Sequence, residues 1–247
     1  NKGEVLNLDI KKSSLNINFK NNKKIIKSKI KTFGISKYPE IKKISSLLGL
    51  SLKNINNIDF KSNLETSLQL SINNRFKITD RKFSINGNIE EFNLEHKKFR
   101  SINEFLPSYN SKITLKDAKI NFNQNKDLNL SGFIKFDEKF ENFSLTSNIG
   151  KDPNFRGEIN LNDLPLKIPQ LNYIKEKNIK NNIKFNIDSS KSSYGINQLI
   201  YTSKKTKIEL DKIKLNKKIE IKDISNIKVI TFLNNIKNND FTIGKHK

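Results

Sequence analysis

Hydrophobic and polar residues alternate with a period of two over most of the chain. The segment "VLNLDI" at residues 5–10 shows the pattern near the start, and "NIKFNI" at residues 182–187 shows it near the end. Because successive side chains of a β-strand point to opposite faces, each such segment has one apolar and one polar face. This pattern is typical of antiparallel sheets with one face in water. We therefore expect about fifteen strands, mostly antiparallel.

Short polar segments separate the alternating runs and predict the turns between strands. They are "INNR" at residues 72–75, "NQNKD" at 123–127, "FDEKFEN" at 136–142, "GKDPN" at 150–154 and "DSSKSSYG" at 188–195. Such clusters of Asn, Asp, Ser, Gly and Pro favour turns.

Few segments have the pattern of a helix. Pro39–Leu48 is the best candidate, because Pro39 suits a first helical position, its apolar residues form one stripe, and Gly49 can end the helix. We expect further short helical turns near Ser101–Tyr109 and Leu164–Lys175, which their prolines limit in length.

The chain is strongly basic, with a formal net charge of +22, and contains neither Cys nor Met. Without Cys, it can form no disulfide and has no thiol nucleophile. Without an initiating Met, we expect it to be a piece of a longer protein. Nucleic-acid recognition relies on arginine forks and on aromatic rings interleaved with basic residues. Here lysine dominates and the aromatics alternate away from the basic face, so we expect no nucleic-acid partner.

The sequence shows no recognisable catalytic motif, and we expect no enzymatic activity, cofactor or metal. The two histidines, His96 and His246, lie in no metal-binding pattern. Two pairs of neighbouring carboxylates lie in polar contexts typical of turns, and we expect them to be solvated. These pairs are Glu90 with Glu91 and Asp137 with Glu138. Glycines within strand patterns, at Gly87, Gly132 and Gly157, indicate bulges or bends rather than a ligand site.

The apolar face of the strands is the main candidate for function. It is either the closed core of a structural or adhesive β-protein, or an open groove for apolar ligands. In the middle of the chain, the residues that would contact lipid tails are Leu68, Leu70, Ile72, Phe83, Ile85, Ile113, Leu115, Ile120, Phe122, Leu128, Leu130, Ile134, Phe136, Phe143, Leu145, Ile159 and Leu161. A third interpretation, a basic module that binds nucleic acid or another polyanion, requires the lysines to gather on one face.

A sparse repeat relates two parts of the chain, because Gly157 lies seventy residues after Gly87 (157 minus 87). The later copy contains Gly157, Ile159, Leu161, Asp163, Leu164, Pro165, Leu166, Leu171 and Tyr173, and the earlier copy contains Gly87, Ile89, Leu94 and Phe105. This pattern resembles the AsmA-like superfamily of β-rich envelope proteins, of the TamB and YhdP type. Tyr173 stands where that family often has Trp.

The resemblance implies an elongated, curved antiparallel sheet, a repeating β-groove with a few short helices. Repeat units would span residues 62–150 and 151–247, after a first unit at 1–61 with its helix near 39–48. The protein would be periplasmic and anchored in the inner membrane through a segment outside this chain. Its partners would be phospholipid acyl chains and further envelope proteins. Its function would be bridge-like phospholipid transport and outer-membrane lipid homeostasis, without catalytic residues.

Overall fold

A computed structural model describes residues 3–5, 7–20, 23–47, 52–98, 100–124, 126–148, 153–190, 193–216 and 221–244 of the chain. These residues form an open antiparallel sheet of fourteen strands, not closed into a barrel, and a separate sheet of two strands. The expectation of a mainly β protein with few short helices is therefore confirmed.

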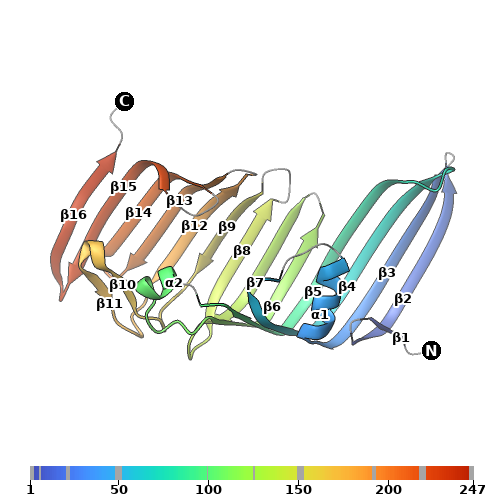
Figure 1. The fold of residues 1–247 in the computed structure, drawn as a ribbon, viewed down its shortest axis with the longest axis horizontal. Helices are drawn as coiled ribbons and strands as arrows, with labels where there is room; N and C mark the ends of the chain where they lie inside the picture. Colours follow the sequence, from blue (N-terminus) through green and yellow to red (C-terminus); the bar gives the residue numbers. More distant parts are fainter. Residues whose placement is uncertain are drawn as a thin grey trace. The chain divides into compact units, whose positions relative to one another are not determined.

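The strands of the large sheet follow one another in sequence order (Figure 1). The first seven are β1 (Gly3–Val5), β2 (Leu8–Lys20), β3 (Lys23–Ser36), β4 (Ile55–Asn73), β5 (Ile78–His96), β6 (Lys112–Asn123) and β7 (Asp127–Lys135). The other seven are β8 (Glu141–Asn148), β9 (Asn154–Ile159), β12 (Asn182–Ser189), β13 (Ser193–Ser203), β14 (Thr206–Asn216), β15 (Ile221–Leu233) and β16 (Ile236–Gly244). Strands β10 (Leu166–Ile168) and β11 (Tyr173–Lys175) pair only with each other.

The chain divides into two compact units. Unit 1 comprises Asn1–Lys97 and Ile113–Gly132, and unit 2 comprises Lys98–Lys112 and Phe133–Lys247. We describe each unit by itself. The expected sequence repeats stay a prediction, because compact units and repeats are different properties of a chain.

Two of the three expected helical segments form helices. Helix α1 (Tyr38–Leu47) lies where Pro39–Leu48 predicted it and contacts β4. The hydroxyl of Tyr38 donates a hydrogen bond to the carbonyl of Ile55, the first residue of β4, over 3.3 Å. Helix α2 (Arg100–Phe105) is a short helix close to the expected turn at Ser101–Tyr109.

The expected helical turns at Leu164–Lys175 are mostly wrong. A 3-10 turn, η1, spans only Pro169–Leu171, and β10 and β11 pair on either side of it. The residue before a proline is pushed towards extended conformations, and Ile168 has φ −122° and ψ 90°. Asn172 then adopts a left-handed conformation (φ 46°) that reverses the chain into β11.

Gly87 was expected to mark a bulge or bend, but the strand register is regular there and the glycine instead permits a close backbone approach. It lies in β5 opposite Leu64 with φ 151°, and a Cβ at this position would collide with the carbonyl oxygen of Asn63. Gly132 is similar, because a Cβ there would lie 2.7 Å from the Cα of Ala118. Both glycines therefore serve the packing of strands.

We predict that Gly87→Ala lowers the free energy of unfolding by at least ~2 kcal/mol, because alanine tolerates neither the φ nor the contact. Gly195→Ala is the matched control, since a Cβ at Gly195 meets only the Cβ of Asp188, at 3.8 Å. Urea denaturation of both variants measures the difference. Equal destabilisation by the two substitutions would contradict this account of Gly87.

Candidate functional site

The strand register of unit 1 places apolar side chains next to one another on one face. Directly opposed residues of paired strands share a face and contact across the strands. Neighbouring ladders across β2 to β5 are Ile17–Ile26–Leu70, Leu15–Ser28–Leu68–Phe83 and Ile30–Thr66–Ile85. The face extends onto β6, where the ring of Phe122 packs edge-on against Phe83 with centroids 5.9 Å apart.

A β-bulge in β5 keeps this face apolar. Ile89 lies opposite Ser62, and Phe92 lies opposite Phe60, so Glu90 is the extra residue between them. A bulge inserts one residue and thereby reverses which side chains face the core. Glu90 forms an ion pair with Lys61 at 2.7 Å. The pair Glu90 and Glu91 therefore lies within a strand, and the expectation of a turn there is wrong.

Left-handed residues switch the apolar parity within two other strands. In β6, Leu115 and Ala118 are buried, while Asp117 between them has φ 49° and is exposed. In β14, Lys212 has φ 52° between Leu210 and Ile213. Because of these irregularities, Leu115 and Ala118 lie on the same face of β6, although one has an odd and the other an even residue number. The same holds for Leu210 and Ile213 in β14.

The apolar face of unit 1 is only partly buried. Among the described residues of this unit, only Leu8, Leu115 and Ala118 are buried apolar side chains. Leu68, in the middle of β4, is 36% exposed, and Leu15 of β2 is 65% exposed. A packed protein core would bury such residues almost completely. Apart from α1, which contacts β4, the described part of unit 1 provides no second layer over this face.

Unit 2 has a similar set of ladders across more strands. From β8 to β16 they are Phe143–Ile159–Ile183–Tyr201–Ile208–Val229–Phe241 and Leu145–Gly157–Phe185–Leu199–Leu210–Ile227–Ile243. The ring of Phe185 packs where a side chain of Gly157 would be, since a Cβ there would overlap the ring. Glycine at this position therefore lets the aromatic ring lie flat in the ladder.

Residues Leu164–Lys175, which we call the strap, cover part of this second face. Tyr173 of the strap forms a buried cluster with Tyr201, Ile208 and Val229 of the sheet. Leu166, Ile168 and Leu171 of the strap pack against this cluster. Nine apolar side chains are buried among the described residues of unit 2: Tyr109, Ile134, Leu161, Leu164, Tyr173, Tyr201, Ile208, Ile213 and Val229. The strap thus gives unit 2 a small core of its own.

Polar contacts fix the strap at its turn. The hydroxyl oxygens of Tyr173 and Tyr201 lie 3.0 Å apart in a buried hydrogen bond. Burial, with a smaller effect of Tyr173, raises the pKa of Tyr201. The side-chain amide of Asn239 in β16 donates to the carbonyl of Leu171 over 2.7 Å.

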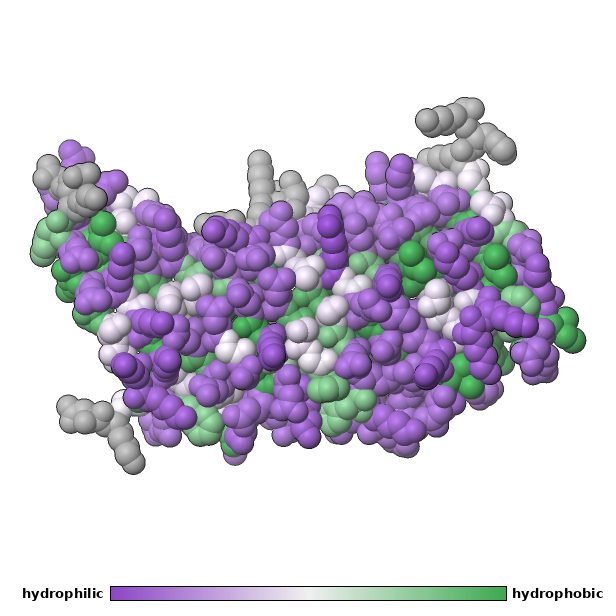
Figure 2. Space-filling model, turned by 180° about the vertical axis from the view of Figure 1, so that it is seen from behind, coloured by the Kyte–Doolittle hydropathy of each residue, from purple (hydrophilic) through white to green (hydrophobic). Residues whose placement is uncertain are grey.

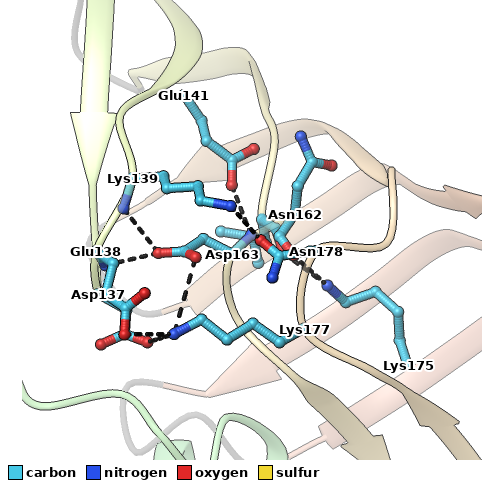
Figure 3. Close-up of polar contacts among 10 residues, drawn as sticks. Asp137, Glu138, Lys139, Glu141, Asn162, Asp163, Lys175, Lys177 and Asn178 are labelled. Atoms are coloured by element: carbon cyan, nitrogen blue, oxygen red, sulfur yellow. Dashed lines mark hydrogen bonds and ion pairs between the residues drawn. The ribbon is translucent and has the colours of Figure 1, made fainter.

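Asp163, the residue directly before the strap, anchors the start of the strap (Figure 3). Its carboxylate, only 3% exposed, accepts hydrogen bonds from the backbone N–H groups of Glu138 and Lys139 over 2.6 and 2.8 Å. Its own N–H donates to Glu141 over 2.7 Å. Burial raises the pKa of Asp163, but the two N–H donors and Lys177 outweigh it, so that this pKa is lowered overall. The β7–β8 loop therefore holds the strap through a charged carboxylate.

Lys175 anchors the strap at its last residue (Figure 3). It is 3% exposed, and its ammonium donates to the carbonyls of Leu161 and Asn162 over 2.8 and 3.1 Å. Burial lowers its pKa to about 8, against the opposing effect of Glu141 and Asp163. A lysine with such a lowered pKa could act as an amine nucleophile. The ammonium of Lys175, however, donates its hydrogen bonds to two backbone carbonyls. The contacts therefore describe a structural anchor.

Asp137 and Glu138 were expected to be solvated; the side chain of Glu138 is 67% exposed, in line with this, whereas that of Asp137 is only 21% exposed. Both lie in the loop after β7, and each forms an ion pair with Lys177 at 2.9 Å. These hydrogen bonds raise the pKa of Lys177. The pair therefore supports the loop that binds Asp163.

Most of the predicted lipid-contact residues lie in strands of the large sheet. Fifteen lie in strands: Leu68, Leu70, Ile72, Phe83, Ile85, Ile113, Leu115, Ile120, Phe122, Leu128, Leu130, Ile134, Phe143, Leu145 and Ile159. Exposure alternates along β7 from Asp127 to Ile134, so that Gly132 does not reverse the parity. Phe136 lies beyond β7 and packs on Tyr109 with centroids 6.0 Å apart, and Leu161 lies beyond β9. These two are outside the strands that were expected to contain them.

The described residues contain no group of three His, Asp or Glu side chains placed to hold a metal ion. His96 ends β5, with Nδ1 2.7 Å from the carbonyl of Lys97, whereas His246 lies outside the described residues. No helix within the described ranges is both long and apolar enough to cross a bilayer.

Comparison with known proteins gives no relative. No protein-family model, no curated protein and no solved structure matches the chain. The resemblance to the AsmA-like superfamily therefore depends on the sequence pattern alone.

We predict that Asp163→Asn lowers the free energy of unfolding by about 2 kcal/mol, because the buried N–H groups of Glu138 and Lys139 lose a charged acceptor. Asp80→Asn, an exposed site on β5, is the control and should change stability by less than about 0.5 kcal/mol. Urea denaturation provides both values. A similar effect of the two substitutions would mean that the Asp163 anchor contributes nothing.

We predict a pH-dependent difference between the wild type and Lys175→Met. The pKa of Lys175 is about 8 in the folded chain and 10.5 ordinarily, so the unfolded chain binds more protons between these values. Stability contributed at this site therefore rises with pH from about 8 to 10.5. Thermal melts at several pH values should show that the melting temperature of the wild type rises relative to that of the variant over this range. A difference that is independent of pH would contradict a lowered pKa.

Proposed function

We propose that the apolar faces of the two units bind phospholipid acyl chains, and that the protein serves bridge-like lipid transport in the periplasm of a two-membrane envelope. The observation that carries this proposal is the exposed apolar face of unit 1. It consists of Leu, Ile and Phe ladders over successive strands, with few buried members.

An exposed apolar face of this kind needs a cover. Apolar patches larger than a few hundred Å² promote association in soluble proteins, and mark sites that bind a partner. Acyl chains are a suitable cover, because each buried CH₂ contributes about 0.8 kcal/mol and no hydrogen bonds are required. The two ladders that contain Leu68 and Thr66 present hydroxyls at Ser28 and Thr66 and carry no charge, while Lys24 and Arg81 lie at one end of the face. This composition favours an apolar ligand over a polar one.

The opposite face of the sheet supports the same assignment. Figure 2, which views the side turned away in Figure 1, shows a surface on which hydrophilic residues predominate. On unit 2 the polar face pairs charges, as in Lys184 with Glu158 at 3.6 Å. A water-facing side and an apolar side suit a protein that holds lipid tails against one face of a sheet.

The two alternatives have weaker support. A structural or adhesive protein with a closed core requires a second layer, and among the described residues the strap covers only part of unit 2 and α1 contacts only β4 in unit 1. A polyanion-binding module is favoured by the net charge of +22 alone. The periplasmic location, the membrane anchor and the envelope partners are proposals that come from the family resemblance.

We predict that Leu68→Asp abolishes most binding of a fluorescent phospholipid while the melting temperature changes little. A carboxylate at this position would lie against acyl chains, at a cost of several kcal/mol, but Leu68 is 36% exposed in the free chain. Gln69→Asp adds the same charge to the polar face of β4 and is the matched control. A photo-crosslinking residue at position 68 identifies what covers the face.

Two results would contradict the proposed function. One is a collapse of the melting temperature in Leu68→Asp together with crosslinks to protein only, which would indicate a closed core. The other is equal lipid binding by Leu68→Asp and Gln69→Asp.

A further inference from the structure

An exposed aromatic side chain lies at the turn between β4 and β5 of unit 1. Phe76 is 76% exposed and has φ 58°, a left-handed conformation that is costly for a residue with a Cβ. The turn fixes it there, because the side-chain oxygen of Asn73 accepts the N–H groups of Arg75 and Lys77, each over 3.0 Å. The N–H of Phe76 also donates to the carbonyl of Asn73 over 2.9 Å. Its exposure is therefore a property of the turn.

Further apolar and cationic groups surround Phe76. The ammonium of Lys24 lies 4.6 Å from the ring centroid of Phe76 and 5.8 Å from that of Phe19. Phe19 is 74% exposed, and Ile78, next to the turn, is 60% exposed. We call Phe19, Lys24, Arg75, Phe76 and Lys77 the basic aromatic tip.

We propose that the basic aromatic tip docks on the surface of a bilayer that contains anionic lipids. Aromatic rings favour the boundary between headgroups and acyl chains, and Lys and Arg extend their charges to the phosphates. Each cation near an anionic membrane contributes attraction that salt weakens. The tip presents both kinds of group, and its positive charge complements the negative surface.

The tip adjoins the candidate lipid-binding face, and this step rests on the proposed function. Phe19, Lys24 and Ile72 form one ladder across β2, β3 and β4. The next ladder on the same face is Ile17–Ile26–Leu70. A lipid that leaves a bilayer at the tip would therefore meet the apolar face directly.

Two described hairpin turns, β13–β14 and β15–β16, provide matched controls, because each has only one of the two kinds of exposed group. The β13–β14 turn carries two exposed lysines, Lys204 and Lys205. The β15–β16 turn is followed by Ile236, which is 73% exposed and therefore as accessible as Phe76.

The test is flotation of the full chain with vesicles of phosphatidylcholine alone or with one-third phosphatidylglycerol. We expect binding only to the anionic vesicles, and at least a tenfold loss of partitioning in Phe76→Ser and in the double variant Arg75→Gln/Lys77→Gln. Ile236→Ser and Lys204→Gln/Lys205→Gln should each lose less than twofold. Circular dichroism confirms that every variant is folded.

Equal losses in the tip variants and their controls would overturn the proposal, since charge or exposed area alone would then explain binding. Undiminished binding of Phe76→Ser would also overturn it. Capture of a fluorescent phospholipid from detergent micelles separates this result from the proposed function. If the chain captures the phospholipid and the tip variants still bind vesicles normally, only the proposal for the basic aromatic tip is refuted. If the chain captures no phospholipid, the proposed function is refuted.

Discussion

Each strand of this sheet must keep its register with its neighbours, because a shift of one residue would turn its apolar side chains into water. The ladders Leu15–Ser28–Leu68–Phe83 and Ile183–Tyr201–Ile208–Val229 exist only through that register. The irregularities preserve it: the bulge at Glu90 and the left-handed residues at Asp117 and Lys212 each reset the parity where the sequence changes phase. The apolar face of each unit is therefore maintained by local distortions of the backbone.

Covering such a face requires polar contacts as well as apolar ones. The strap covers part of the face of unit 2, and both of its ends are fixed by nearly buried charges. Asp163 accepts two backbone N–H groups, and Lys175 donates to two backbone carbonyls. A buried charge is costly unless its hydrogen bonds are satisfied. The small apolar cluster around Tyr173 thus depends on polar neighbours that hold the strap in place.

The sequence predicted the features that have a local cause. Period-two alternation predicted the strands, and Pro39 with its apolar stripe predicted α1, whereas Gly87 was expected at a bulge or bend and instead permits a close backbone approach. The strap was misjudged, because its short strands depend on prolines and on a long-range partner in the sheet. Lys175 was missed, since nothing local separates it from the other lysines. Its role comes from carbonyls that only the folded chain brings near.

The two units meet the same physical demand in different ways. Unit 2 folds a segment of its own chain over its ladders and buries Tyr173, Tyr201, Ile208 and Val229. Unit 1 has ladders of the same kind but leaves Leu15 and Leu68 substantially exposed among its described residues. Because the hydrophobic effect is proportional to the apolar area removed from water, both faces favour a cover equally well. Under the proposed function, acyl chains supply the cover that the described residues of unit 1 do not provide, and the proposed membrane contact at Phe76 and Lys24 lies at one end of the same ladders.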